Sequence, residues 1–293
     1  MQKNLVLIDI DGMFYHACRD TLEDSIETFK EKLDNCLIQT NAYYWAGFVT
    51  KGKCFRYNID KNYKANRKKA VRPKWLNVLK EWAIAEYDLV ICNTHEADDA
   101  VMYWMNKNLY LSIPPIGESY ITDVQEGDWS HVEFNKILCS PDKDLLYNLP
   151  GKHFNYTYYL EDKKKPESLV KGTWVETSEE ESNYFKLKQL MIGDVSDNIK
   201  TPFPESAGDW FVKNKMNFND VVSAYILGFN YETKTGMKKF VKGMGTTVGL
   251  IELAKNYRLL HLLESDEDFI REVGKVPWFP IISKVLKEEE IKF

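Results

Sequence analysis

The chain has 293 residues, of which 44% are hydrophobic and 28% charged, and its formal net charge is −5. This composition is typical of a folded globular protein and excludes a disordered tail or a fibrous repeat. No apolar run approaches the roughly 18 residues that a transmembrane helix needs. The N-terminal segment lacks the pattern of a secretory signal. We therefore expect a cytoplasmic protein with no membrane partner.

The five cysteines are scattered and include no CxxC pair, and the five histidines show no metal-ligand spacing. We therefore expect reduced thiols, with neither a disulfide scaffold nor a zinc site. Any metal ion that the chain binds must then be held by oxygen ligands.

Apolar and amphipathic segments alternate along the first half of the chain. Short apolar runs predict strands at 5–10, 41–49, 89–92 and 136–139, and helical periodicity predicts helices at 22–39, 74–86 and 97–109. Residues 114–133 lack periodicity and are predicted to form a surface excursion. The alternation predicts an α/β fold with a mainly parallel central sheet flanked by helices.

The pattern changes near residue 175. Ser178 and Glu181 form a capping box, which predicts the start of a helix. Residues 218–293 are interpreted as helical, with basic patches that include Lys234, Lys238, Lys239 and Lys242. We expect an α/β core at 1–175 and a helical C-terminal region at 176–293.

Acidic residues gather in four short clusters at the ends of predicted strands or helices. They are Asp9 with Asp11; Glu96, Asp98 and Asp99; Asp142 with Asp144; and Asp194 with Asp197. Taken singly, each cluster also fits a solvated loop, a turn or a helix N-terminus that carries compensating charge. Together they predict one site, because ligand sites form at the carboxyl ends of parallel strands. Repulsion among so many carboxylates favours hard divalent cations, Mg²⁺ or Mn²⁺.

A basic segment with interspersed aromatic residues precedes the second predicted helix. It comprises Lys61, Tyr63, Lys64, Arg67, Lys68, Lys69, Arg72, Lys74 and Trp75. A solvated loop is the structural alternative. In an acidic protein, however, such a concentration of positive charge suits a phosphate backbone, with aromatic rings available for stacking on bases. Lys64 and Arg67 share one face at helical spacing, so they can clamp a scissile phosphate.

Five motifs resemble those of the flap endonuclease and 5′-exonuclease family, especially its bacteriophage members. In chain order they are LVLIDIDGMFYHA, NYKANRKK, EADDAV, CSPDKDLLYNLPG and QLMIGDVSDNI. The resemblance implies a PIN-like fold with an arch at about 60–95 and a C-terminal DNA-binding region that completes the metal site. It also implies metal-dependent hydrolysis of DNA at 5′ ends and at 5′-flap or single-strand/duplex junctions, in replication or repair.

The resemblance further implies the roles of individual residues. Metal ligands or their supports are Asp9, Glu96, Asp98, Asp99, Asp142, Asp144, Asp194 and Asp197, with Asp9 rather than Asp11 aligned to the first aspartate of the family. Catalytic roles fall to Asp9, Asp142, Lys64 and Arg67. Nucleic-acid contacts fall to Tyr63, Lys64, Arg67, Lys68, Lys69 and Arg72. The implied cofactors are two Mg²⁺ or Mn²⁺ ions, with K⁺ left open, and the implied state is a monomer that works with replication proteins.

The chain departs from the family pattern at two places. A further aspartate is usual at the end of the second strand, where this chain has Thr50; Asp11 or a water molecule is the expected replacement. The glycine-rich helix-hairpin-helix after the last aspartates is replaced by residues 201–206, with sequence TPFPES.

Three alternative functions remain open at this stage. The first is a structure-specific DNA-binding protein with weakened catalysis, because a metal ligand is missing. The second is a haloacid-dehalogenase-type phosphatase, in which Asp9 is the nucleophile and Asp11 the acid/base. The third is a nuclease of RNA or of RNA/DNA hybrids on the same scaffold.

Overall fold

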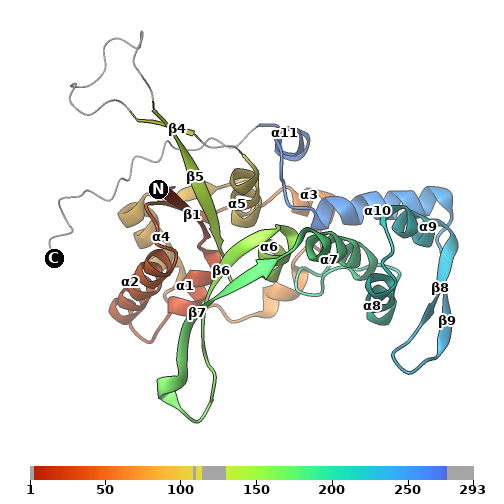
Figure 1. The fold of residues 1–293 in the computed structure, drawn as a ribbon, viewed down its shortest axis with the longest axis horizontal. Coiled ribbons are helices and arrows are strands. Elements are labelled where there is room, and N and C mark those ends of the chain that lie inside the picture. Colours follow the sequence, from red (N-terminus) through yellow and green to blue (C-terminus); the bar gives the residue numbers. More distant parts are fainter. Residues whose placement is uncertain (1–2, 108–109, 114–129, 276–293) are drawn as a thin grey trace, which may run out of the picture.

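The computed structural model describes residues 3–107, 110–113 and 130–275 (Figure 1). Within these ranges seven strands form one sheet in the order β3-β2-β1-β5-β6-β7, and β4 pairs with β5. The strands are β1 (Lys3–Asp9), β2 (Tyr44–Thr50), β3 (Val90–Cys92), β4 (Tyr110–Ile113), β5 (Ser130–Cys139), β6 (Gly151–Leu160) and β7 (Leu169–Thr177). Neighbours from β3 to β6 pair in parallel, whereas β4 and β7 run antiparallel to their partners.

Strand β1 is buried on both faces because helices cover both sides of the sheet. Val6 and Ile8 belong to one hydrophobic core, and Leu5 and Leu7 belong to the other, as the alternation of side chains along a strand requires. The first core packs under α1 (Asp11–Ala17), α2 (Leu22–Gln39) and α4 (Leu76–Tyr87), and the second under α5 (Ala97–Asn106) and α6 (Lys143–Asn148). The carboxyl ends of β1 and β5 are thereby held side by side.

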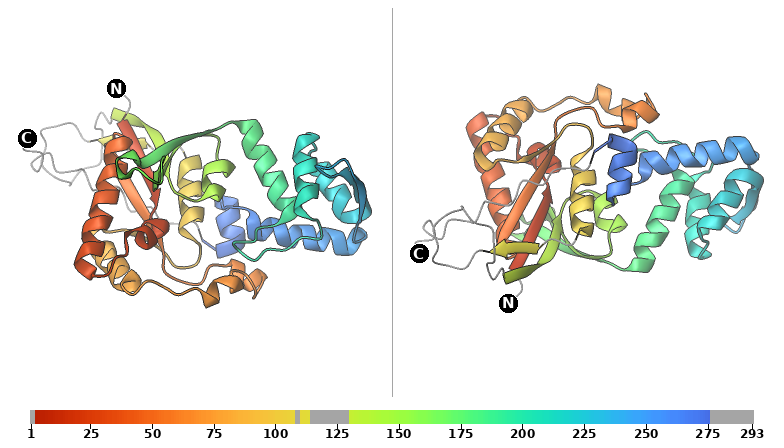
Figure 2. Two further views of the ribbon diagram at one scale, coloured as in Figure 1. Left: turned by 90° about the horizontal axis from the view of Figure 1, so that it is seen from below. Right: turned by 90° about the horizontal axis from the view of Figure 1, so that it is seen from above.

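A helical region with its own core lies beside the sheet (Figures 1 and 2). Its elements are α7 (Glu179–Ile192), α8 (Glu205–Lys213), α9 (Phe218–Leu227), β8 (Gly228–Glu232), β9 (Lys238–Lys242), α10 (Thr246–Leu260) and α11 (Asp266–Val273). Between β2 and α4 the chain forms α3 (Arg56–Ile59) and the 3₁₀ helix η1 (Ala65–Lys69), and a second 3₁₀ helix, η2 (Pro166–Ser168), precedes β7. No described helix is long and apolar enough to span a bilayer.

The predicted α/β architecture is confirmed, and each predicted strand and helix of the first half corresponds to an observed element within a few residues. The end of the predicted excursion is wrong, because β5 already begins at Ser130; residues 114–129 lie outside the described part of the chain. The antiparallel β6–β7 pair was not predicted. The proposed boundary near residue 175 remains a prediction.

The helical interpretation of 218–293 is wrong at 228–242, where β8 and β9 form a two-stranded ribbon. Gly228 and Gly236 have φ angles of +82° and +79°, which favour glycine and interrupt a helix. Phe229, Tyr231 and Val241 alternate along the two strands and pack on the helical core. Residues 276–293 lie outside the described ranges.

Phe29 of α2 gives a test of the first core. Its ring is fully buried and stacks on Phe14 with centroids 5.1 Å apart. We expect Phe29→Ala to lower the free energy of unfolding by about 3–5 kcal/mol, because it removes buried surface and leaves a cavity. Ile38→Ala on the same helix, where the side chain is 74% exposed, is the control and should change stability by at most about 0.5 kcal/mol in urea denaturation. Similar losses for both variants would contradict this assignment of the core.

Candidate metal and phosphate site

Asp9 ends β1 at the edge of the sheet where β5 also ends. Its Oδ2 accepts a hydrogen bond of 3.0 Å from the Ser140 hydroxyl, which follows β5 directly. Tyr156 of β6 donates to the Asp9 carbonyl oxygen at 2.6 Å. Parallel pairing of β1 with β5 thus places the Asp9 carboxylate beside the segment that carries Asp142 and Asp144.

Three further carboxylates come to this edge from α6 and from the end of α7. Asp142 caps α6 and accepts the Asp144 N–H at 2.8 Å. Asp144 Oδ1 accepts a bond of 2.9 Å from Gln189 of α7. Asp194 follows α7; its Oδ2 lies 3.2 Å from Lys143 Nζ. We call Asp9, Asp142, Asp144 and Asp194 the strand-end carboxylates.

The strand-end carboxylates are short of positive charge. Burial, together with Asp11 and Asp142, raises the pKa of Asp9 to about 7. Burial, Asp142 and Asp194 raise the pKa of Asp144 to about 7 as well. Only for Asp194 do hydrogen bonds from Ser196 and the charge of Lys143 outweigh burial and lower the pKa. A cation at this edge would therefore be stabilised by carboxylates that now repel one another.

A second acidic group lies between α5 and the loop after α7, and it is already neutralised by the basic segment. Tyr63 places its hydroxyl 2.6 Å from Glu96 Oε2 and 2.8 Å from Asp197 Oδ2. Lys64 Nζ contacts Glu96 Oε1 and lies 3.7 Å from Asp197. Arg67 Nη2 donates to Asp197 Oδ1 at 2.5 Å. We call Tyr63, Lys64 and Arg67 the basic clamp.

The electrostatics of this group follow from its ion pairs. Burial opposes ionisation of Glu96, but Lys64 and Arg56 lower its pKa to about 2. Burial likewise opposes protonation of Lys64, and Glu96 and Asp197 more than offset it, so the pKa of Lys64 is raised. Asp98 forms no ion pair with any described residue; burial, Asp99 and Glu96 raise its pKa well above the usual range.

Arg56, which the sequence did not single out, pairs with Asp99 in the interior. Its two Nη atoms donate to the two Asp99 oxygens at 2.7 Å each, and the Arg56 side chain is 2% exposed. Arg56 also donates to the carbonyl oxygens of Leu259 and His261. The predicted metal role of Asp99 is untested, but its carboxylate is occupied in joining α3, α5 and the end of α10. A lone arginine in the aromatic run CFRY was the available sequence signal.

Thr50 at the end of β2 is accompanied by a carboxylate from another strand end. Asp11 Oδ2 accepts the Thr50 N–H at 3.0 Å. Lys80 of α4, which was not predicted, donates to Asp11 Oδ1 at 2.8 Å and to the Thr50 carbonyl oxygen at 2.6 Å. Asp11 thus lies where the sequence analysis expected a replacement, and it carries its own counter-ion.

Three residues of the basic segment that were predicted to contact nucleic acid lie outside the basic clamp: Lys68, Lys69 and Arg72. Arg72 is exposed and forms no ion pair with any described residue. Lys68 and Lys69 lie in η1, and their side chains are outside the described part of the structure. Their predicted contacts with nucleic acid remain predictions.

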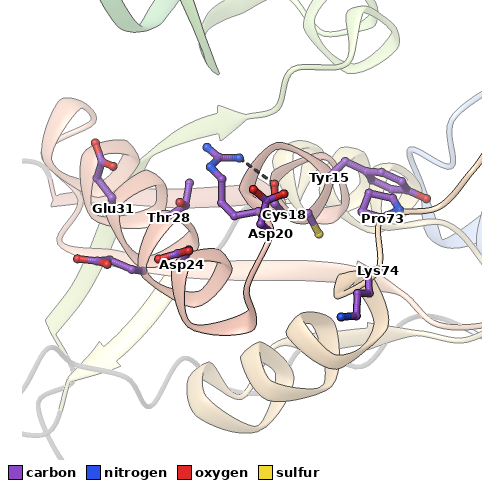
Figure 3. A pocket seen from close by; sticks show the side chains of 10 residues that line it. Tyr15, Cys18, Asp20, Asp24, Thr28, Glu31, Pro73 and Lys74 are labelled. Carbon is purple, nitrogen blue, oxygen red and sulfur yellow. Dashed lines mark hydrogen bonds between the residues drawn. The ribbon is translucent and has the colours of Figure 1, made fainter.

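An open hollow of about 980 Å³ lies elsewhere, between α1, α2 and the segment before α4 (Figure 3). Asp20, Asp24, Glu27 and Glu31 line it, along with Arg19 and Lys74. None of the predicted metal ligands or clamp residues contributes to it. Its excess of carboxylates opposes phosphate binding, and we assign it no part in the site.

The chemistry of the strand-end carboxylates fits a divalent cation, but their side chains are not yet arranged around one ion. Within the described residues, no three acidic, histidine or cysteine side chains are already placed to hold one ion together. A hard cation is favoured by the oxygen donors, by the raised pKa values and by the buried Asp194 Oδ2, which lies against Lys143. Binding would require Lys143 to leave Asp194.

The Arg56–Asp99 pair gives a stability test. We expect Arg56→Ala to cost about 3–5 kcal/mol, because it leaves an uncompensated carboxylate in the interior. Lys51→Ala breaks a pair with Glu81 in which the side chains are 42% and 60% exposed, and should cost at most about 1 kcal/mol. Urea denaturation of both variants measures the difference. A small loss at Arg56 would show that water reaches this pair.

The raised pKa of Asp144 gives a pH test. Between its usual value of 3.8 and the folded value of about 7, the folded protein holds a proton that the unfolded chain has released, so this group's contribution to stability falls as pH rises through that interval. Asp144→Asn removes the contribution. In chelator, its stability relative to the parent protein should therefore increase from about pH 4 to about pH 7 in urea titrations. An unchanged difference would show that Asp144 ionises normally.

No protein-family model matches the sequence, and no curated protein sequence matches it. Solved structures do match. A bacteriophage T5 protein co-crystallised with metal ions shares 18% identity over 89% of this chain and 90% of the other, with a TM-score of 0.54. The bacteriophage T5 flap endonuclease in a complex with DNA and metal ions shares 16% over the same fractions, with a TM-score of 0.52. The bacteriophage T5 5′-exonuclease with bound zinc shares 17%, again with a TM-score of 0.52. The chain has the PIN-like fold of these 5′ nucleases.

Proposed function

We propose that the chain is a divalent-metal-dependent 5′ nuclease that hydrolyses DNA at 5′ ends and at 5′-flap or single-strand/duplex junctions. The observation that carries the proposal is the convergence of Asp9, Asp142, Asp144 and Asp194 at one sheet edge, near Asp197, which contacts the basic clamp and also helps to raise the pKa of Asp144. The shared fold supports the nuclease over the phosphatase. The structures at TM-scores above 0.5 include a DNA complex and metal complexes of 5′ nucleases.

The strand-end carboxylates would hold the metal, with Mg²⁺ or Mn²⁺ as the preferred ion and two ions as the preferred number. When bound, the metal would supply an activated water and charge stabilisation for an in-line displacement. The protein supplies the frame. Ser140 and Tyr156 orient the last residue of β1, and Gln189 orients Asp144.

The basic clamp would hold the scissile phosphate. Lys64 and Arg67 now contact Glu96 and Asp197, so a phosphate must compete with these carboxylates for the two cations. Lys64 stays protonated because both carboxylates raise its pKa. Its charge is then available for the negative charge that develops on the phosphate in the transition state.

The experiment is cleavage of an end-labelled 5′-flap duplex with Mg²⁺, with a matched sample in chelator. We expect metal-dependent products at the junction or from the 5′ end, and loss of activity with an intact fold in Asp142→Asn. Tight DNA binding without cleavage under Mg²⁺ or Mn²⁺ would favour the binding protein with weakened catalysis. An RNA/DNA hybrid of the same shape tests the alternative substrate.

Replacement of Lys64 separates catalysis from binding. We expect Lys64→Ala to lower the cleavage rate by about 10²–10³-fold while DNA affinity falls far less, because the side chain acts mainly on transition-state charge. Lys61→Ala is the matched control: Lys61 is exposed in the same segment and pairs with no described acidic residue. Single-turnover kinetics and anisotropy titrations measure the two quantities. Equal losses in rate and affinity would make Lys64 a tether only.

A further inference from the structure

The ribbon formed by β8 and β9 carries an excess of positive charge, with Lys238 and Lys242 on one face and Lys239 on the other. The segment 228–244 contains four lysines and one glutamate, a net charge of +3 in a protein whose net charge is −5. Lys238, Phe240 and Lys242 occupy alternate positions of β9 and therefore share one face. Phe240 is 60% exposed, and both lysines are exposed. An aromatic ring thus lies between two cations on an open surface.

One carboxylate lies on this face, because Glu232 of β8 is opposite Lys238 of β9. Lys238, Lys239 and Lys242 form no ion pair with any residue in the described ranges, whereas Lys234 at the turn pairs with Asp209 at 3.1 Å. The hairpin of β6 and β7 differs. Its tip contains three lysines, Lys163 to Lys165, among three acidic residues, and has no net charge. Surface lysines are therefore not uniformly distributed, and an anionic partner fits the β8–β9 face specifically.

The other face fixes the ribbon to the helical core. Phe229 packs on Phe203, Trp210 and Phe211, with ring centroids 5.7–6.4 Å apart. At the root, a Cβ on Gly228 would lie 2.1 Å from the Val241 carbonyl oxygen, so the two strands enter the core in close contact. The lysine-bearing face is consequently held in one orientation. A partner would bind it without ordering a loose loop.

We propose that the β8–β9 ribbon is a binding surface for the phosphate backbone of double-stranded DNA. A two-stranded β-ribbon fits the major groove, and the exposed lysines of β9 can contact phosphates that border it. Phe240 supplies an apolar contact between them. The ribbon lies at the end of the molecule away from the sheet (Figure 1). It would hold the duplex arm of a substrate at a distance from the strand-end carboxylates.

This inference rests on the proposed function for the choice of DNA, and it supplies a duplex contact in a chain without the glycine-rich helix-hairpin-helix of the family. Residues 201–206 occupy the position of that motif in the sequence, and their Phe203 packs in the helical core. The ribbon is the adjoining element in which exposed lysines without an ion pair to any described residue are concentrated. Met237 and Met244 are also exposed in this segment, so a protein partner is an outcome that the test must distinguish from DNA.

The test compares two triple variants of the full chain. The ribbon variant is Lys238→Ala with Lys239→Ala and Lys242→Ala; the control replaces Lys163, Lys164 and Lys165 by alanine. Binding to a blunt DNA duplex is measured in chelator over a range of salt concentrations. We expect the ribbon variant to reduce the slope of log affinity against log salt by up to about 3, at about 0.9 per phosphate contact. The control should retain the parent slope, and lysine-to-arginine replacements in the ribbon should restore it.

The outcomes separate this inference from the proposed function. Parent affinity and slope in the ribbon variant would overturn the inference, even if the protein cleaves flaps. An equal loss in the control would overturn it too, because net charge alone would then explain binding. Loss confined to the ribbon variant supports it, even if the parent protein cleaves no flap and the proposed function fails. If a protein partner is the ligand, duplex binding is unchanged, and the inference is overturned.

Discussion

The burial and mutual repulsion of carboxylates at one edge of the sheet are the constraint that shapes this site. Parallel pairing of β1 with β5 brings Asp9 beside the segment of Asp142 and Asp144, and α7 delivers Asp194 to the same edge. One ammonium group, that of Lys143, lies against this set. Burial first, and repulsion from the neighbouring carboxylates second, raise the pKa values of Asp9 and Asp144. A cation would relieve this repulsion, and this makes the edge of the sheet receptive to metal.

In the neighbouring acidic group, side-chain cations of the protein already neutralise the carboxylates. Lys64 and Arg67 cross to Glu96 and Asp197, and their charges are released only if a phosphate replaces those carboxylates. Arg56 with Asp99 fixes the base of this arrangement: it bonds α3 to α5 and to the end of α10. Because its partners come from both halves of the chain, that pair also ties the helical region to the sheet. Stability and the geometry of the clamp therefore share one buried interaction.

The ribbon of β8 and β9 extends this division of labour. The sheet edge concentrates negative charge that suits a cation. The ribbon carries exposed positive charge and is fixed to the helical core through Phe229. The net charge of −5 conceals both. An acidic protein can thus bind a polyanion, because local surfaces rather than the total charge determine association. Separation of the two surfaces also keeps the ribbon lysines from neutralising the carboxylates that a metal would need.

By itself, the sequence determined the α/β fold. The order of apolar residues in runs such as 5–10 and in periodic segments such as 22–39 records which side chains are buried, and that order is local to each segment. The sequence also predicted a set of candidate metal ligands, because their short motifs resemble those of a known family, and the structure brings Asp9, Asp142, Asp144 and Asp194 to one edge of the sheet. The tertiary structure alone determined which cationic side chain pairs with which carboxylate. Arg56 pairs with Asp99, and Lys80 with Asp11, across 43 and 69 residues. Such pairing depends on packing, which no local pattern records. The sequence analysis did not predict the β8–β9 ribbon for the same reason. Its alternating side chains acquire a buried face only because they pack against the helical core.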